Sequence, residues 1–183
     1  MRYMVELRSY SEDGDDYSED HYDFETREEC LKFAKQKGVN TLVRPDNLAT
    51  DFSKTVDVLK HQLNYFKKQN IICDAIILLQ PTNPFREDDL LKNAIKKFQE
   101  SGRNSLATFS VSEKKLGKIE DGFFKPTNYT PGQRSQDLEK YYFENGLLYI
   151  TKCDSILVGK IITDDVFLLI CESLGSTVDI DEL

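Results

Sequence analysis

The chain has 183 residues, of which 39% are hydrophobic and 31% charged, and its formal net charge is −8. This length and composition suit a single globular domain with a sizeable core, and the acidic balance disfavours a nucleic-acid-binding protein, which needs a basic face for phosphate. No run of about 18 apolar residues is present, so no membrane span is expected. The first residues lack the apolar core of a signal peptide.

The cysteines disfavour a zinc site, because Cys30, Cys73, Cys153 and Cys171 are far apart and form no CxxC pair. Scattered cysteines in partly apolar settings are typical of reduced thiols. We therefore expect a cytoplasmic protein.

Residues 1–23 predict a β-hairpin. Side chains alternate along the start of the chain as in a strand. An acidic stretch over residues 11–20 contains an Asp-Gly turn signal, and residues 22–24 supply a return strand. The acidic residues lack the spacing of a calcium loop, so we interpret the stretch as a solvated turn.

Helices and strands alternate after the hairpin. Thr26 and Glu29 have the spacing of a capping box, and the helix that they begin ends at Gly38. A short strand over residues 41–43 and a loop lead to a second helix over residues 53–70, whose apolar residues are spaced by three and four.

A continuous apolar run over residues 75–79 is typical of a strand that is buried on both faces in a parallel sheet. A helix over residues 88–102 and a strand over residues 105–111 follow. The resulting order of helices and strands predicts an α/β fold with a mostly parallel sheet and helices on both faces.

The later part of the chain predicts an excursion from the sheet and a return to it. Residues 112–133 are polar and rich in turn signals, and we interpret them as a small β-arm. Strands over residues 147–150 and 166–170, with a short helix over residues 155–157 between them, complete the predicted fold.

Gln80 and Thr82 are candidate ligand-binding residues, because they follow the buried strand directly. Ligands of open α/β sheets bind just beyond the carboxyl ends of the strands. Two prolines, Pro81 and Pro84, hold this exit in a rigid, extended turn. The alternative interpretation is a plain connection between strand and helix.

Asp179 and Asp181 are candidate metal ligands. Residues i and i+2 of a strand project to the same face, so the two carboxylates would point together. Oxygen ligands with open positions suit Mg²⁺. The alternative is an acidic end of the chain without a metal.

Two arginines are candidates for anion binding. Arg44 follows a predicted strand and suits a phosphate or a base carbonyl, and its alternative role is an ion pair with Asp46 or Asp51. Arg134 follows a Pro-Gly turn and suits bidentate capture of a carboxylate. Its alternative is an exposed loop arginine.

Five motifs stand in a fixed order along the chain. They are Arg44-Pro45 with Leu48-Ala49 and Asp51, the run LLQPTNPFR over residues 78–86, Arg134-Ser135-Gln136-Asp137-Leu138, Asn145-Gly146 with Tyr149-Ile150, and Val178-Asp179-Ile180-Asp181. Together they resemble the acylneuraminate cytidylyltransferase family, the CMP-sialic acid synthetases and their relatives for other nonulosonic acids. The resemblance covers the chain from about residue 26 to its end, and the run over residues 78–86 is its most specific part.

The resemblance implies a Rossmann-like nucleotide-sugar transferase fold and a reaction between CTP and an acidic nine-carbon sugar that gives the CMP-sugar and pyrophosphate, with Mg²⁺ as cofactor. It also implies a homodimer in which the arm over residues 112–133 reaches towards the neighbour. By position in the motifs, the nucleotide-binding residues are Arg44 and Thr55, the sugar-binding residues are Gln80, Thr82, Arg134, Asn145 and Tyr149, and the catalytic metal pair is Asp179 and Asp181. For Asn145 and Tyr149, a turn and packing are the alternative roles.

The chain differs from the family pattern over residues 1–23. The family begins with a strand and a Gly/Ser-rich loop that holds the triphosphate, whereas this segment offers Gly14 among aspartates. We therefore expect one domain over residues 1–183 with an atypical N-terminal hairpin and no phosphate loop. A truncated or non-catalytic homologue that keeps the sugar-binding side and dimerises is the alternative function.

Overall fold

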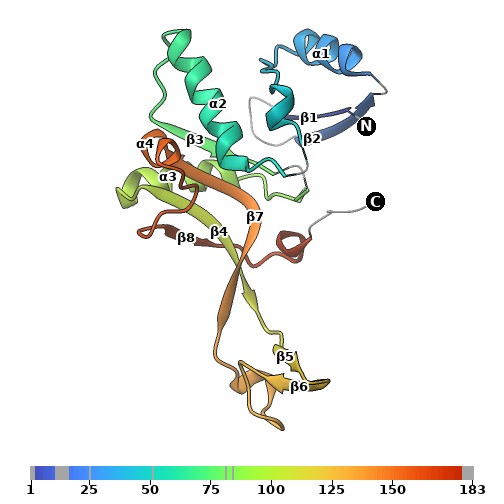
Figure 1. Cartoon of the computed structure of the whole chain (residues 1–183), viewed down its shortest axis with the longest axis vertical. Coiled ribbons are helices and arrows are strands. Elements are labelled where there is room, and N and C mark those ends of the chain that lie inside the picture. Colours follow the sequence, from blue (N-terminus) through green and yellow to red (C-terminus); the bar gives the residue numbers. More distant parts are fainter. Residues whose placement is uncertain are drawn as a thin grey trace. The chain divides into compact units, whose positions relative to one another are not determined.

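The computed structural model describes residues 3–10, 17–24, 26–50, 52–80, 82–83 and 85–178. The chain divides into two units (Figure 1). The N-terminal unit comprises Met1–Asp74 and Ile156–Lys160, and the sheet unit comprises Ala75–Ser155 and Ile161–Leu183.

The N-terminal unit contains the predicted hairpin. Strand β1 (Tyr3–Tyr10) pairs antiparallel with β2 (Tyr17–Phe24), with Tyr3 opposite Phe24 and Tyr10 opposite Tyr17. The hairpin prediction is confirmed. The prediction that residues 11–20 form the turn is wrong in part, because residues 17–20 belong to β2 and the return strand begins at Tyr17 rather than at Tyr22. Residues 11–16 lie outside the described residues.

Helix α1 (Arg27–Gln36) begins at the predicted capping box. The Glu29 backbone N–H donates to Thr26 Oγ1 at 3.3 Å, and the Thr26 N–H donates to Glu29 Oε2 at 3.2 Å. Gly38 follows the helix with a φ of 73°, a left-handed conformation that favours glycine. Both predicted ends of this helix are confirmed.

Helix α2 (Thr55–Lys68) is also close to its prediction and buries Leu59 and Leu63. The predicted strand over residues 41–43 is wrong, because this segment is irregular and leads to the 3₁₀ turn η1 (Asp46–Leu48). A three-residue segment with a proline shortly after it has few backbone donors for a strand ladder.

The sheet unit holds a four-stranded mixed sheet in the order β3-β7-β4-β8. Strands β3 (Ala75–Leu78) and β4 (Ser105–Ser112) both run antiparallel to β7 (Tyr141–Lys152), and β4 runs parallel to β8 (Phe167–Ile170). The α/β class is confirmed, but the prediction of a mostly parallel sheet is wrong. The chain leaves β4 and comes back along β7 without a crossover helix, so β7 enters between β3 and β4 in the opposite direction.

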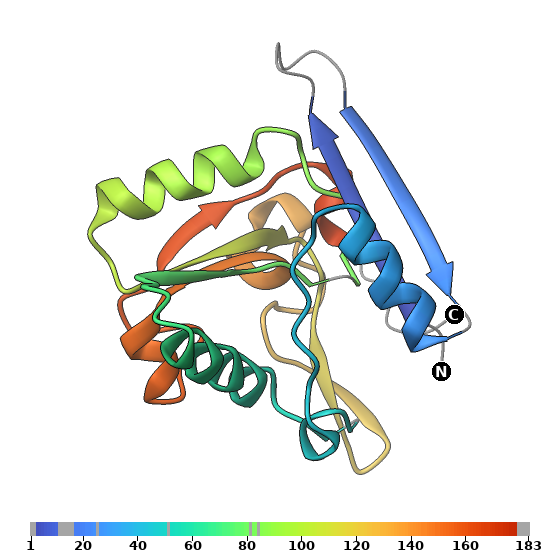
Figure 2. The same ribbon diagram turned by 90° about the horizontal axis from the view of Figure 1, so that it is seen from above.

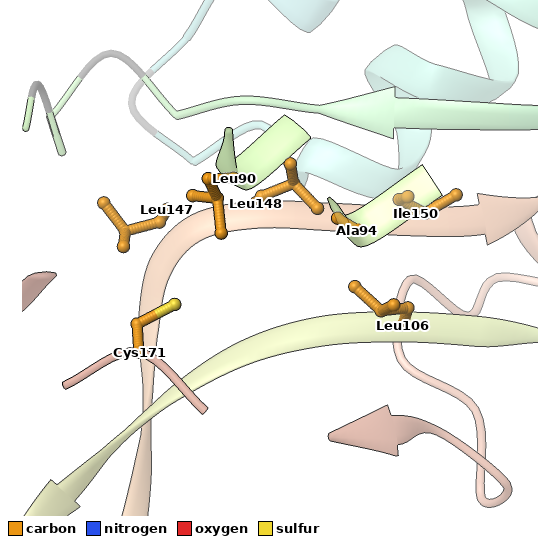
Figure 3. Close-up of a cluster of buried hydrophobic side chains, with 7 residues drawn as sticks. All are labelled: Leu90, Ala94, Leu106, Leu147, Leu148, Ile150 and Cys171. Carbon is orange, nitrogen blue, oxygen red and sulfur yellow. The ribbon is translucent and has the colours of Figure 1, made fainter. Parts of the chain in front are cut away.

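Helix α3 (Leu90–Ser101) lies along one face of this sheet (Figure 2). Its side chains meet those of the sheet in a buried cluster made of Leu90, Ala94, Leu106, Leu147, Leu148, Ile150 and Cys171 (Figure 3). Each large apolar side chain buried in this way contributes roughly 1.5–3 kcal/mol to folding. The cluster therefore makes the sheet and α3 a stable support for the loops at the ends of the strands.

The predicted arm is present in the sheet unit. Strands β5 (Gly117–Glu120) and β6 (Phe123–Pro126) form an antiparallel hairpin. Figure 1 shows this hairpin at the far end of long extensions of β4 and β7. Within the described ranges, no helix has both the length and the apolar character needed to cross a bilayer.

Candidate functional site

The segment after β3, residues 79–86, is called the exit loop. Arg86 holds its course: Nε donates to the Leu147 carbonyl oxygen at 2.8 Å, and a terminal guanidinium nitrogen donates to the Gln80 carbonyl oxygen. The Asn83 N–H also donates to the Gln80 carbonyl oxygen, at 3.3 Å. One half-buried cation therefore fixes the backbone at Gln80 against strand β7.

Strand β7 bulges opposite the exit loop. Residues 145–148 stand against the single β4 residue Thr108, and Gly146 has a φ of 74°. The Leu148 N–H donates to Thr108 Oγ1 at 3.1 Å, and the Leu147 N–H donates to Asn145 Oδ1 at 3.2 Å. Side chains thus satisfy the backbone groups that the bulge removes from the ladder.

The exit loop and the bulge meet at Gly146. A Cβ atom added there would lie 2.6 Å from Gln80 Oε1 and would also collide with Asn83 Oδ1. No side chain fits in that space, so the Gln80 and Asn83 carboxamides lie directly over the glycine backbone. The close approach explains why glycine occupies this position.

Asn83 is 1% exposed and links two distant segments. Its Nδ2 donates to the Val178 carbonyl oxygen at 3.0 Å. Its Oδ1 is buried without a hydrogen-bond partner in the part of the chain that the structure describes. An unsatisfied buried acceptor costs about 1–3 kcal/mol, so the loop keeps an energetically unfavourable group next to Gln80.

A second buried polar cluster lies on the other side of Asn145. Asn145 Nδ2 donates to Ser110 Oγ at 3.0 Å, and Ser110 Oγ donates to the Cys171 carbonyl oxygen at 3.2 Å. Ser176 Oγ donates to the Ser173 carbonyl oxygen at 2.6 Å and lies 3.0 Å from Ser110 Oγ. These bonds join the bulge to β4 and to the 3₁₀ turn η3 (Leu174–Thr177). Burial raises the pKa of the Cys171 thiol, and the Glu87 charge adds to the rise, while a hydrogen bond with Asn145 opposes it.

Ser110, Cys171 and Ser176 of this cluster line an open cavity of about 530 Å³. Lys114 and Lys140 line the cavity, together with Glu113 and Glu172. Charges of both signs around a polar floor suit a polar, ionised ligand or an interface with mixed charge.

The structure places four predicted sugar-binding residues on the exit loop and on β7. Gln80 and Thr82 are half-buried in the exit loop. Asn145 is buried in the bulge, where its carboxamide bonds to Ser110 and to the backbone. The Tyr149 side chain is 8% exposed, and its hydroxyl lies 3.5 Å from Glu144 Oε2.

Arg134 lies apart from these residues along the chain, beside the turn η2 (Ser135–Asp137). Its guanidinium makes a bidentate, exposed ion pair with Asp137, with Nε–Oδ2 and N–Oδ1 distances of 2.7 and 3.0 Å. Arg134 therefore binds a carboxylate in the predicted bidentate manner, but that carboxylate is Asp137 of the same chain. An exposed pair of this kind contributes little to stability and can open when another carboxylate is offered.

The predicted nucleotide-binding residues belong to the N-terminal unit. Arg44 is exposed just before η1, and Thr55 is the first residue of α2. Asp179 and Asp181 lie outside the described residues. Among the residues that are described, no group of three or more His, Cys, Asp or Glu side chains is arranged to hold a metal ion.

Sequence reasoning missed the roles of Asn83, Arg86 and Thr108. All three act through backbone carbonyl or N–H groups of segments far away in the sequence. A signal was present for Asn83, since a small amide residue between two prolines in a rigid turn is well placed to bond to a backbone. Nothing in the sequence indicates which backbone it reaches.

No family model matches the chain. It is 27% identical over 150 residues to a CMP-N,N'-diacetyllegionaminic acid synthase of Legionella pneumophila, which covers 76% of this chain and 62% of that protein. It is 29% identical over 131 residues to a pseudaminic acid cytidylyltransferase of Campylobacter jejuni, covering 67% and 55% of the two chains. It is 27% identical over 139 residues to an N-acylneuraminate cytidylyltransferase of Streptococcus agalactiae, covering 73% and 32%. The chain thus spans less than two thirds of the length of these relatives.

Proposed function

Because the chain is a distant relative of the acylneuraminate and nonulosonic acid cytidylyltransferases, we propose that it activates a sialic-acid-like sugar with CTP. The anomeric hydroxyl oxygen of the sugar attacks the α-phosphorus, the bond from that phosphorus to pyrophosphate breaks, and the hydroxyl proton is released. The products are the CMP-sugar and pyrophosphate. The protein contributes positioning and charge stabilisation.

The observation that carries this proposal is the arrangement at the exit loop. Gln80 stands just after β3, with its backbone carbonyl bonded by Arg86 and its carboxamide lying over Gly146. A carboxamide on so rigid a support can distinguish sugar hydroxyl and amide groups by hydrogen bonding. The same run of residues gives the resemblance to the cytidylyltransferases its specificity.

The other assignments are part of the same proposal. Thr82, Asn145 and Tyr149 form the sugar side with Gln80, and Asn145 does so through the bulge that it supports. Arg134 exchanges Asp137 for the sugar carboxylate. Arg44 and Thr55 bind the nucleotide.

Asp179 and Asp181 would hold Mg²⁺. Carboxylate oxygens are the ligands that this ion prefers, and the preceding residue, Val178, is held at the exit loop by Asn83. When bound, the ion neutralises charge on the phosphates. The two carboxylates hold it, and the exit loop holds the sugar.

We also propose that the arm mediates a homodimer. Ile119 and Phe123 of the β5–β6 hairpin are 79% and 73% exposed, and Phe124 of the same hairpin is exposed as well. Large apolar side chains gathered on a projecting hairpin are typical of an interaction surface. A second copy of the chain is the partner that the family resemblance implies.

Pyrophosphate release from CTP and Mg²⁺, measured with a panel of nonulosonic acids, tests the function. We expect turnover with at least one sugar and a loss of roughly 100-fold or more in Gln80→Ala, as for a residue whose hydrogen bonds orient the substrate. Gln99→Ala is the matched control, because Gln99 is an exposed glutamine on α3. No turnover with any sugar contradicts the proposed catalysis.

Calorimetry separates the alternative function. A homologue that keeps only the sugar-binding side binds the sugar and not CTP, whereas the proposed enzyme binds both. For the dimer, light scattering should give twice the chain mass for the wild type and for Ile72→Ser, and a monomer mass for Phe123→Ser. Ile72 is a suitable control because it is 92% exposed and lies outside the arm.

A further inference from the structure

We infer that the carboxamide oxygens of Asn83 and Gln80 form an acceptor pair that binds an amide N–H of the ligand. Asn83 thereby has a ligand-binding role in addition to its bond with the Val178 backbone. The inference rests on the proposed function, in which Gln80 belongs to the sugar side of the site.

The two oxygens converge on one point beside Gly146. A Cβ atom at Gly146 would lie 2.6 Å from Gln80 Oε1 and would come still closer to Asn83 Oδ1. Both acceptors are therefore directed at the same small space next to the glycine backbone. Two partial negative charges directed at one point repel each other, and a hydrogen-bond donor placed between them relieves that repulsion.

The Asn83 oxygen has no donor within the described chain, and its carboxamide is not free to turn over. Nδ2 donates to the Val178 carbonyl oxygen at 3.0 Å, and this bond fixes which end of the carboxamide faces Gly146. Asn83 is 1% exposed, and its Oδ1 has no hydrogen-bond partner among the described residues. Because buried polar groups are nearly always hydrogen-bonded, we assign the missing donor to a ligand.

The chemistry of the pair favours a group that only donates. A hydroxyl carries lone pairs as well as a hydrogen atom, whereas an amide N–H has no acceptor to set against the two oxygens. Gln80 is half-buried, so one member of the pair borders the solvent from which a ligand arrives. The acceptor pair therefore selects a sugar that carries an acylamino group.

A change of one atom in the ligand tests the pair. The probes are N-acetylneuraminic acid and its analogue in which an ester oxygen replaces the N–H of the acetamido group. Calorimetry in the absence of CTP gives the dissociation constant of each. We expect the wild type to bind the amide at least about tenfold more tightly than the ester, because the ester leaves the buried oxygen without a donor.

Two variants of the full chain remove the acceptor pair in different ways. Asn83→Leu removes the buried oxygen and keeps a side chain of similar size. Gly146→Ala keeps both carboxamides and places a methyl group at the point on which they converge. Gly102→Ala is the matched control, because Gly102 has a φ of 64° and a Cβ there would meet nothing within 4 Å. The ratio of ester to amide dissociation constants should fall to about one in the two site variants and stay at the wild-type value in the control.

This ratio separates ligand binding from a purely structural role of Asn83. A variant that only loosens the loop weakens the binding of both probes equally, so an unchanged ratio in Asn83→Leu overturns the inference. Equal affinities of the wild type for amide and ester overturn it as well, and so does a wild type that binds neither. If circular dichroism shows that Asn83→Leu does not fold, Gly146→Ala decides the question.

The outcome is independent of turnover, because binding is measured without CTP. A chain that prefers the amide but releases no pyrophosphate contradicts the proposed catalysis and leaves the acceptor pair in place. A chain that turns over a sugar without this preference supports the catalysis and overturns the acceptor pair.

Discussion

Gly146→Ala is the sharpest test of the geometry at the exit loop. The new methyl group would lie 2.6 Å from Gln80 Oε1 and would collide with Asn83 Oδ1. It would also stand on a backbone with a φ of 74°. The substitution therefore combines two costs, a left-handed conformation for a residue with a Cβ and the displacement of two packed carboxamides.

The two costs can be separated. A non-glycine residue in the left-handed region costs about 1–2 kcal/mol, and overpacking a well-packed site costs typically 1–3 kcal/mol. We therefore expect Gly146→Ala to lower the free energy of unfolding by roughly 2–5 kcal/mol. Gly102→Ala isolates the first cost, because Gly102 has a φ of 64° and a Cβ there would meet nothing within 4 Å.

Urea denaturation followed by circular dichroism measures both variants, since the chain has no tryptophan to serve as a fluorescent probe. Both glycines lie in the sheet unit, so the same transition reports on each. The excess loss in Gly146→Ala over Gly102→Ala is the cost of the collision. Equal losses in the two variants would refute the close approach of Gln80 and Asn83 to the bulge.

Three further predictions concern single side chains of the sheet unit. Arg86→Met removes two charged hydrogen bonds to backbone carbonyls, each worth about 1.5–3 kcal/mol, and should lower the free energy of unfolding by about 3–6 kcal/mol. Arg86→Lys should be intermediate, and a Lys variant as stable as the wild type would contradict the need for both bonds. Hydrogen bonds, chiefly from Thr163, lower the pKa of Asp165 in the folded chain. The loss of melting temperature in Asp165→Ala should therefore be largest above the unfolded pKa of about 3.9, and it should vanish as pH falls through the lowered folded pKa. A loss that does not depend on pH would count against this bond. Burial raises the pKa of Cys171, so iodoacetamide should modify this thiol more slowly in the folded chain than in urea at the same pH, and equal rates would show that the thiol is accessible.

The sequence predicts helix ends and hairpins well, because residues within a few positions determine them. The capping box of Thr26 and Glu29 and the glycines at positions 38 and 102 act within one helical turn, and the structure has helix ends at all three places. The hairpin β1–β2 and the arm hairpin β5–β6 likewise depend on turn signals within a few residues. Such features need no knowledge of what packs against them.

The direction of the sheet was not predictable in the same way. An apolar run looks the same whether its neighbour is parallel or antiparallel, so the run over residues 75–79 could not reveal that β7 lies beside it in the opposite direction. The prediction that this strand is buried on both faces is wrong, because β3 lies at the edge of the four-stranded sheet and Ile77 and Leu79 are exposed. The sequence likewise does not reveal the bulge at Asn145-Gly146, where it predicts a sugar-binding residue or a turn. Its function as a bulge depends on Thr108, which is far away in the sequence and supplies the missing hydrogen bonds.

The residues of the run over 78–86 fall into two groups, those that hold the loop in place and those that are proposed to bind the sugar. Two residues of the run have structural roles. Asn83 donates a hydrogen bond to the Val178 carbonyl oxygen, and Arg86 donates to the carbonyl oxygens of Leu147 and Gln80. Sequence specificity in this run therefore arises in part from holding the loop, and it would persist in a homologue that had lost catalysis.

A sharper criterion for function follows from this division. Substitutions of Asn83 or Arg86 change stability whether or not the chain binds a ligand, because their partners are backbone groups of this chain. Gln80 and Thr82 differ, because their proposed partners are on the sugar. We therefore expect Gln80→Ala and Thr82→Ala to lose sugar binding without a change in the free energy of unfolding. This result would distinguish a chain that still binds the sugar from one that keeps only the fold.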